Sequence, residues 1–189
     1  MHDATRKSSL ASPWFWLGVL VLSGLDLWTK SWAWQFFGQG IQPVAGTWLG
    51  WQTIHNPGGI FGMGQNFTIA LTIVRVFAVA LILVLVHRQA RDNRIGLVTL
   101  TLLVAGAIGN LYDNLSTWMP WAGNGQVRDF IRVYFESPGW WPTVLPWPFS
   151  PWPIFNLADS FICVGFLLLI SGFAAIQIEP GDATAEEGE

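Results

Sequence analysis

Four long stretches of the chain are apolar, and more polar segments separate them. Each approaches the length of about 20 residues that a helix needs to cross the hydrocarbon core of a bilayer. The pattern predicts transmembrane helices at about residues 14–37, 67–86, 95–112 and 155–176. The first is not expected to be a cleaved signal peptide, because its apolar stretch continues through Asp26 with no small-residue cleavage site behind it.

The two longer segments between the predicted spans differ in pattern. Residues 38–66 contain short alternating runs and a turn sequence, Asn56-Pro57-Gly58-Gly59, which together predict a small β-rich segment. Residues 112–154 hold six Trp and, after Ser137, a Pro every few residues. Proline at that density is incompatible with a regular helix, so we predict an irregular flap whose Trp side chains lie at the membrane interface.

Composition supports an all-α membrane protein. Of 189 residues, 52% are hydrophobic and 11% are charged, whereas a soluble domain carries about 25% charged residues. The net charge of −3 and the lack of a basic stripe indicate no nucleic-acid partner. Cys163 is the only cysteine, predicted as a buried thiol, and no Cys/His cluster has zinc spacing. We expect one monomeric membrane domain over residues 1–178 and a disordered acidic tail over 179–189.

The basic residues predict the orientation of the spans. Arg6 and Lys7 precede the first span, three Arg lie within residues 87–94, and residues 38–66 contain no Lys or Arg. Because short loops rich in Lys and Arg stay in the cytoplasm, both termini are expected there. We therefore expect a protein of the bacterial cytoplasmic (inner) membrane. Residues 38–66 and 112–154 would then face the periplasm.

Ionisable residues inside the spans are the first candidates for function, because each costs about 2.5 to 3.5 kcal/mol near a helix centre. Asp26 and Lys30 are four residues apart, so they share a helix face and can form an ion pair. Arg75 lies in mid-span and needs a carboxylate or a water-filled cavity. Further carboxylates and amides converge at the outer ends of the spans: Asp113, Asp129, Asp159, Asn56, Asn110 and Asn156.

These residues fit a limited set of chemistries. His55 is the only outer histidine, so no Ser-His-Asp set is available, and no phosphate-binding loop is present. Two aspartates in a low-dielectric site share a proton, so that one can activate water while the other donates to a scissile carbonyl. Carboxylates alone also suit a metal ion or a proton relay, and a purely structural polar network has the same pattern.

Five short motifs stand at these polar positions. In chain order they are D-x-x-T-K at 26–30, H-N-x-G-x-x-F at 55–61, G-N-x-x-D at 109–113, G-x-V-x-D-F at 125–130 and F-N-x-A-D-S at 155–160. Their order and their place on four spans resemble the lipoprotein signal peptidase family (signal peptidase II).

The resemblance implies an intramembrane aspartic endopeptidase with Asp129 and Asp159 as its catalytic pair. The implied substrate is a prolipoprotein whose cysteine carries diacylglycerol, and cleavage falls just before that cysteine. The resemblance also implies membrane lipid as a partner. It implies no cofactor and no metal. Residues that it implies in substrate binding or in support of the site are Asn56, Gly58, Asn110, Asp113, Asn156, Asp26 and Lys30.

The chain departs from the family pattern in two places. Asn114 stands where the third motif usually continues with Arg, so Arg75, Arg128 or Arg132 is expected to substitute, or the activity is altered. The stretch between the two catalytic aspartates is also long, because of the Trp/Pro-rich residues 137–153.

Two other functions stay open from the sequence. One is a non-catalytic membrane protein that binds lipidated proteins. The other is an ion-coupled carrier, which needs a pathway to both sides although the carboxylates cluster on one side only.

Overall fold

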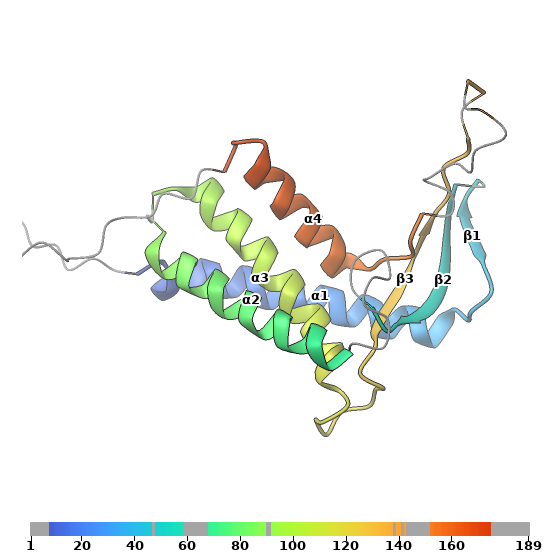
Figure 1. Cartoon of the computed structure of the whole chain (residues 1–189), viewed down its shortest axis with the longest axis horizontal. Helices are drawn as coiled ribbons and strands as arrows, with labels where there is room; N and C mark the ends of the chain where they lie inside the picture. The colour runs from blue at the N-terminus through green and yellow to red at the C-terminus, as the bar shows by residue number, and fades with distance from the viewer. Residues whose placement is uncertain are drawn as a thin grey trace, which may run out of the picture.

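Four helices and a three-stranded sheet make up the computed structural model of the protein, which describes residues 8–46, 48–58, 68–89, 92–137, 139–140, 142 and 152–174. A short 3-10 helix, η1 (Ser9–Ala11), precedes α1 (Pro13–Phe36), α2 (Thr68–Arg88), α3 (Arg94–Leu115) and α4 (Leu157–Ile170). The helices form a bundle, and the sheet lies at one end of it (Figure 1). The α3 helix is central, because it packs against the other three.

A helix forms at each of the four predicted spans, and two of them, α2 and α3, have both the length and the hydropathy to cross a membrane. The α4 helix is apolar but has only 14 residues. The prediction of a fourth span over 155–176 was therefore too long. The helix ends at Ile170, and Gly172 follows with a φ of 74°, a left-handed conformation that breaks the helix.

Two glycines of α3 allow the neighbouring helices to approach closely. A Cβ at Gly106 would lie 2.5 Å from the backbone oxygen of Ala158 at the start of α4. A Cβ at Gly109 would collide with the carboxylate of Asp26 in α1. These contacts bring the polar middle of α1, the end of α3 and the first turn of α4 to the same level.

The sheet consists of β1 (Gln42–Ala45), β2 (Leu49–Asn56) and β3 (Val127–Val133), all antiparallel and in that order. Strands β1 and β2 confirm the β-rich segment predicted within residues 38–66. The β3 strand was not predicted, since the whole of 112–154 was expected to be irregular. The pairing of β2 with β3 places Ile54 opposite Asp129, so the end of β2 lies beside the polar part of β3.

Aromatic side chains attach the sheet to the bundle. The ring of Trp51 in β2 lies 5.9 Å from the ring of Trp32 in α1 and 5.9 Å from the ring of Phe130 in β3. Phe37, just after α1, stacks on the same Trp51. This cluster fixes β3, and with it Asp129, against the end of α1.

Three predicted segments lie wholly or mostly outside the described residues. Most of the Trp/Pro-rich stretch, including residues 143–151, lies outside the described residues, as do the acidic tail at 179–189 and residues 59–61 of the second motif. The single domain over 1–178 stays a prediction.

Candidate active site

Asp129 is fully buried in β3 and receives two side-chain amide donors. The Nδ2 atom of Asn56, at the end of β2, donates to its Oδ2 at 2.9 Å. The Nδ2 atom of Asn156, just before α4, donates to its Oδ1 at 2.6 Å. A carboxylate on a strand is thus held by groups from the two segments next to that strand.

Asp159 lies in the first turn of α4, where it takes part in a capping box. Its backbone N–H donates to Asn156 Oδ1 at 2.9 Å, and its own Oδ2 accepts from the backbone N–H of Asn156 at 3.2 Å. The helix N-terminus favours a negative charge at this position. Asn110 of α3 adds a donor, with its Nδ2 atom 2.8 Å from Asp159 Oδ1.

The two aspartates are joined through Asn110 and Asn156, since Asn156 Nδ2 also lies 3.1 Å from Asn110 Oδ1. The orientation of each amide follows from a partner that can only donate. Lys30 Nζ donates to Asn110 Oδ1 at 3.0 Å, which turns the amide nitrogen of Asn110 towards Asp159. In the same way, the backbone N–H of Asp159 donates to Asn156 Oδ1, and the backbone N–H of Gly58 donates to Asn56 Oδ1. The amide nitrogens of Asn156 and Asn56 therefore face Asp129.

A second cluster, the ion-pair network, consists of Asp26, Lys30, Asp113 and Arg128. Lys30 Nζ lies 2.7 Å from Asp26 Oδ2 and 3.2 Å from Asp113 Oδ2, which confirms the predicted pairing of Asp26 with Lys30. Arg128 lies 2.8 Å from Asp113 Oδ1 through Nη2. The network therefore ties α1 to α3 and, through Arg128, to β3.

Asp26 also accepts a hydrogen bond from a residue that is distant in the sequence. Its Oδ1 accepts a hydrogen bond at 2.9 Å from the backbone N–H of Ala158, one of the free donors in the first turn of α4. Sequence reasoning did not anticipate this contact, because nothing in the spacing relates α1 to the start of α4. It positions the helical turn that carries Asp159.

Burial and the neighbouring charge of Asp159 raise the pKa of Asp129 from 3.8 to about 7, in that order of importance. The hydrogen bonds from Asn56 and Asn156 and the charge of Lys30 act in the opposite direction, and they are outweighed. Asp129 thus changes its protonation state near neutral pH, as general acid–base chemistry requires.

The three arginines proposed to substitute at the Asn114 position have different partners. Arg128 belongs to the ion-pair network, and Arg132 contacts Gln52 and Tyr134 on the sheet. Arg75 of α2 donates through Nη1 to Asn114 Oδ1. The guanidinium that reaches Asn114 is therefore the one from α2.

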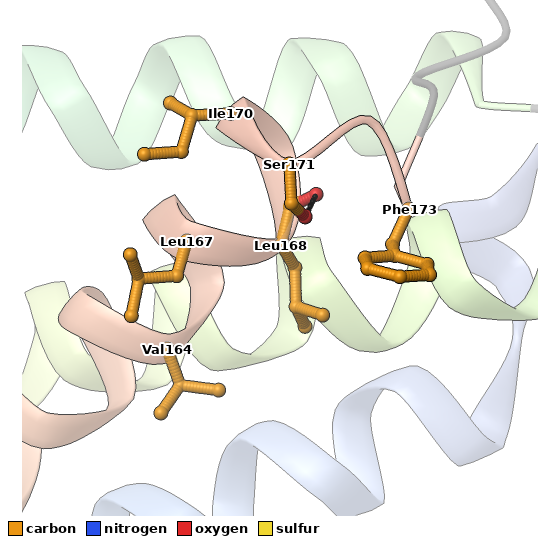
Figure 2. A pocket seen from close by; sticks show the side chains of 6 residues that line it. All are labelled: Val164, Leu167, Leu168, Ile170, Ser171 and Phe173. Atoms are coloured by element: carbon orange, nitrogen blue, oxygen red, sulfur yellow. Dashed lines mark hydrogen bonds between the residues drawn. The ribbon is translucent and has the colours of Figure 1, made fainter.

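Other candidate chemistry lies away from this site. Within the described residues, no group of three or more His, Cys, Asp or Glu is placed to hold a metal ion. Cys163, predicted to be buried, is instead exposed on α4. A shallow apolar groove at the far end of α4, between Val164 and Phe173, presents a single polar side chain, Ser171 (Figure 2). The groove does not contribute to the aspartate pair, which consists of Asp129 and Asp159.

Comparisons with known proteins agree with the motifs. Residues 18–174 match the family model described as signal peptidase (SPase) II. The lipoprotein signal peptidase of Coxiella burnetii (strain RSA 493 / Nine Mile phase I) is 33% identical over 170 residues, covering 88% of this chain and 92% of that protein. The lipoprotein signal peptidase of Geobacter metallireducens is 36% identical over 123 residues, 61% of this chain and 62% of that protein, so this match spans less than two thirds of it.

A solved bacterial membrane enzyme has the same fold, with a TM-score of 0.67 over 84% of this chain and 86% of that chain, at 24% sequence identity. The match to the family model defines the class of this protein as a peptidase. The chain belongs to the signal peptidase II family, as its five motifs predicted.

Proposed function

We propose that this protein is an intramembrane aspartic endopeptidase that removes signal peptides from diacylglyceryl-modified prolipoproteins, cutting before the lipidated cysteine. Membership of the signal peptidase II family supports signal-peptide cleavage. The aspartic mechanism rests on one observation: Asp129 and Asp159 share one network of amides and have no directly bonded cation within the described residues.

We assign different roles to the two aspartates. Asp159 lies in the first turn of α4, and its half-buried side chain is open enough to meet water. Asp129 is fully buried, and its raised pKa of about 7 favours the protonated form below neutral pH. Asp159 is therefore the general base and Asp129 the general acid.

The reaction then follows from these two protonation states. Asp159 takes a proton from water, whose oxygen bonds to the scissile carbonyl carbon, while Asp129 gives its proton to the carbonyl oxygen. In the second step, Asp129 takes back a proton from a hydroxyl of the tetrahedral intermediate and Asp159 protonates the amide nitrogen. The C–N bond breaks, a carboxyl group and an amine are released, and the pair regains its starting protonation.

In this proposal all four helices cross a bacterial inner membrane, with both termini in the cytoplasm and the aspartate pair toward the periplasm. Arg88 and Arg94 lie at the ends of α2 and α3 that are remote from the sheet, in accord with the rule that positive loops stay inside (Figure 1). The diacylglyceryl group would hold the scissile bond near the outer interface, at the depth where α4 begins. Lipid binding away from the reacting bond then supplies positioning energy.

Cleavage of a diacylglyceryl-modified prolipoprotein by the purified protein in detergent tests this function. We expect Asp129→Asn and Asp159→Asn each to lower the rate by about 10²- to 10⁴-fold, because each removes a proton-transfer group. Asp92→Asn, at an exposed position before α3, is the matched control and retains the rate. Full activity in either of the first two variants would contradict the aspartic mechanism.

The same assay separates the alternatives. Binding of the lipidated precursor without cleavage would favour a non-catalytic membrane protein that binds lipidated proteins. Ion flux in proteoliposomes that depends on the two aspartates, again without cleavage, would favour the carrier.

A further inference from the structure

Arg75 is a cation inside a membrane helix that forms no ion pair within the described residues. Its Nη1 atom donates to the neutral Oδ1 of Asn114. The salt bridges of the buried site instead join Lys30 and Arg128 to the carboxylates of Asp26 and Asp113. A guanidinium at this depth costs several kcal/mol on its own, so its charge calls for a function.

Asn114 holds this guanidinium in a fixed place. Its Nδ2 atom donates to the backbone oxygen of Gly125 at 2.7 Å, just before β3, so its Oδ1 atom faces α2. Asn114 is itself buried, with 2% of its surface exposed. The side-chain amide of Asn114 in α3 is therefore hydrogen-bonded both to α2 and to the residue that precedes the strand β3.

The guanidinium lies beside the residues that hold the aspartate pair. Asn114 and Asn110 are four residues apart on α3, so the guanidinium that Asn114 holds lies on the helix face from which Asn110 reaches Asp159. The carboxylates of Asp159, Asp129 and Asp113 are the ones whose charges act on Arg75. Asp113 already has Lys30 and Arg128 as direct partners. The charge of Arg75 is thus available to the pair.

A charge balance points the same way. The cations at the site are Lys30, Arg128 and Arg75, and the carboxylates are Asp26, Asp113, Asp129 and Asp159. When the pair shares one proton, three negative charges face three positive ones. His55 is also near this end of the fold, but it is exposed and packs on Trp34, so it does not enter the balance.

We propose that Arg75, held by Asn114, is the fixed counter-charge that keeps one aspartate of the pair ionised. In the framework of the proposed function it is a positioning residue that acts through Asp159. What matters is then the place of the positive charge and not the helix from which it comes.

An infrared titration tests this without relying on cleavage. The C=O band of protonated carboxyl groups is followed against pH in the purified protein, and its loss in Asp129→Asn and Asp159→Asn assigns the contribution of the pair. Arg75→Gln should move the titration of this band to higher pH by about one unit, because a nearby opposite charge is lost. Arg94→Gln, an equal charge change at an exposed position about 28 Å along α3 from Asp113, should leave it unmoved.

Two further variants separate charge from shape. Arg75→Lys keeps the charge and should titrate near the wild-type midpoint. The double variant Arg75→Gln with Asn114→Arg moves the guanidinium from α2 to α3 and should restore the midpoint. If Arg75→Gln does not fold in detergent, Asn114→Leu replaces it, since it releases the guanidinium from its acceptor and should shift the titration the same way.

The infrared titration can contradict the counter-charge role of Arg75 independently of the cleavage assay that tests the proposed function. An unchanged midpoint in Arg75→Gln, or a shift that neither Arg75→Lys nor the double variant reverses, would overturn the counter-charge role even if the wild type cleaves its substrate. A shift that both reverse supports the role even if the wild type does not cleave. Where cleavage occurs, the acidic limb of its pH profile should move up in Arg75→Gln together with the infrared midpoint.

Discussion

Two carboxylate clusters lie on either side of Asn110, and they are neutralised in different ways. In the ion-pair network, Asp26 and Asp113 are bonded directly to Lys30, and Asp113 to Arg128 as well. In the aspartate pair, the direct partners are the amides of Asn56, Asn110 and Asn156 and one backbone N–H. Both clusters are hydrogen-bonded, but within the described residues only the first has bonded cations.

The difference separates structure from chemistry. A bonded ammonium or guanidinium makes a carboxylate keep its charge, because a proton would have to replace a strong ionic contact. A side-chain amide can position a carboxylate as well as a cation can. Because the amide is neutral, it stabilises the ionised carboxylate less, and the carboxylate can still gain or lose a proton. The ion-pair network therefore has a structural role, in which the loss of one partner is costly, and the aspartate pair can exchange protons.

Removal of the shared cation should have the largest effect on stability. Lys30→Met leaves Asp26 without its bonded cation and removes one of the two from Asp113, so we expect a loss of about 3–5 kcal/mol. Thermal unfolding in detergent measures this loss. Asp129→Asn is the comparison from the other cluster and should lose less stability, because it leaves no bonded cation without its partner. Equal losses in both variants would show that the two clusters do not differ in this way.

Asn110 connects the clusters, and its replacement should affect the reaction more than the fold. Asn110→Leu keeps a similar volume but removes the donor to Asp159, a bond to a charged group worth about 1.5–3 kcal/mol. We expect kcat to fall by roughly 10- to 100-fold with a smaller change in KM. Asn124→Leu, in an exposed turn, serves as the control. A change confined to KM would assign Asn110 to substrate binding instead.

The smallest expected effect is a pH dependence of stability in the aspartate pair. The raised pKa of Asp129 means that the folded state binds a proton more tightly than the unfolded chain. This contribution is complete below about pH 4 and is lost as the pH rises through 7. Asp129→Asn should therefore gain roughly 1–3 kcal/mol relative to wild type between pH 5 and pH 8.

Melting temperatures of the two proteins across this range measure the gain. Asp113→Asn is the counterpart in the ion-pair network, and it should be less stable than wild type throughout, because it leaves Lys30 and Arg128 short of a partner. A constant difference between Asp129→Asn and wild type would show that Asp129 does not titrate in this window. Cleavage by the wild type should also decline above about pH 7, as the general acid loses its proton.

Local patterns in the sequence were sufficient for much of this site. Hydrophobic runs located the four helices, spacing of four residues predicted the pairing of Asp26 with Lys30, and the motifs named the residues that converge around Asn110. These features depend on residues close together in the chain or on a composition that only a membrane requires.

The remaining features depend on contacts between distant segments, which no local pattern encodes. Strand β3 forms because it pairs with β2 and because Phe155 bonds to Ile131, although its sequence lies in a region rich in turns. The contact of Arg75 with Asn114 depends on how α2 packs on α3. The early end of α4 follows from the conformation of Gly172, in a stretch that is otherwise apolar.

The hydrogen bond from Ala158 to Asp26 has a consequence for biosynthesis. Its two residues are 132 positions apart, and the bond positions the turn that bears Asp159. A ribosome adding about 5–20 residues per second needs roughly 7–26 s to pass from one to the other. During that interval the growing chain lacks its second aspartate and the helix on which it stands. Under the proposed mechanism, the nascent chain is therefore unable to cleave other signal peptides until α4 has been made.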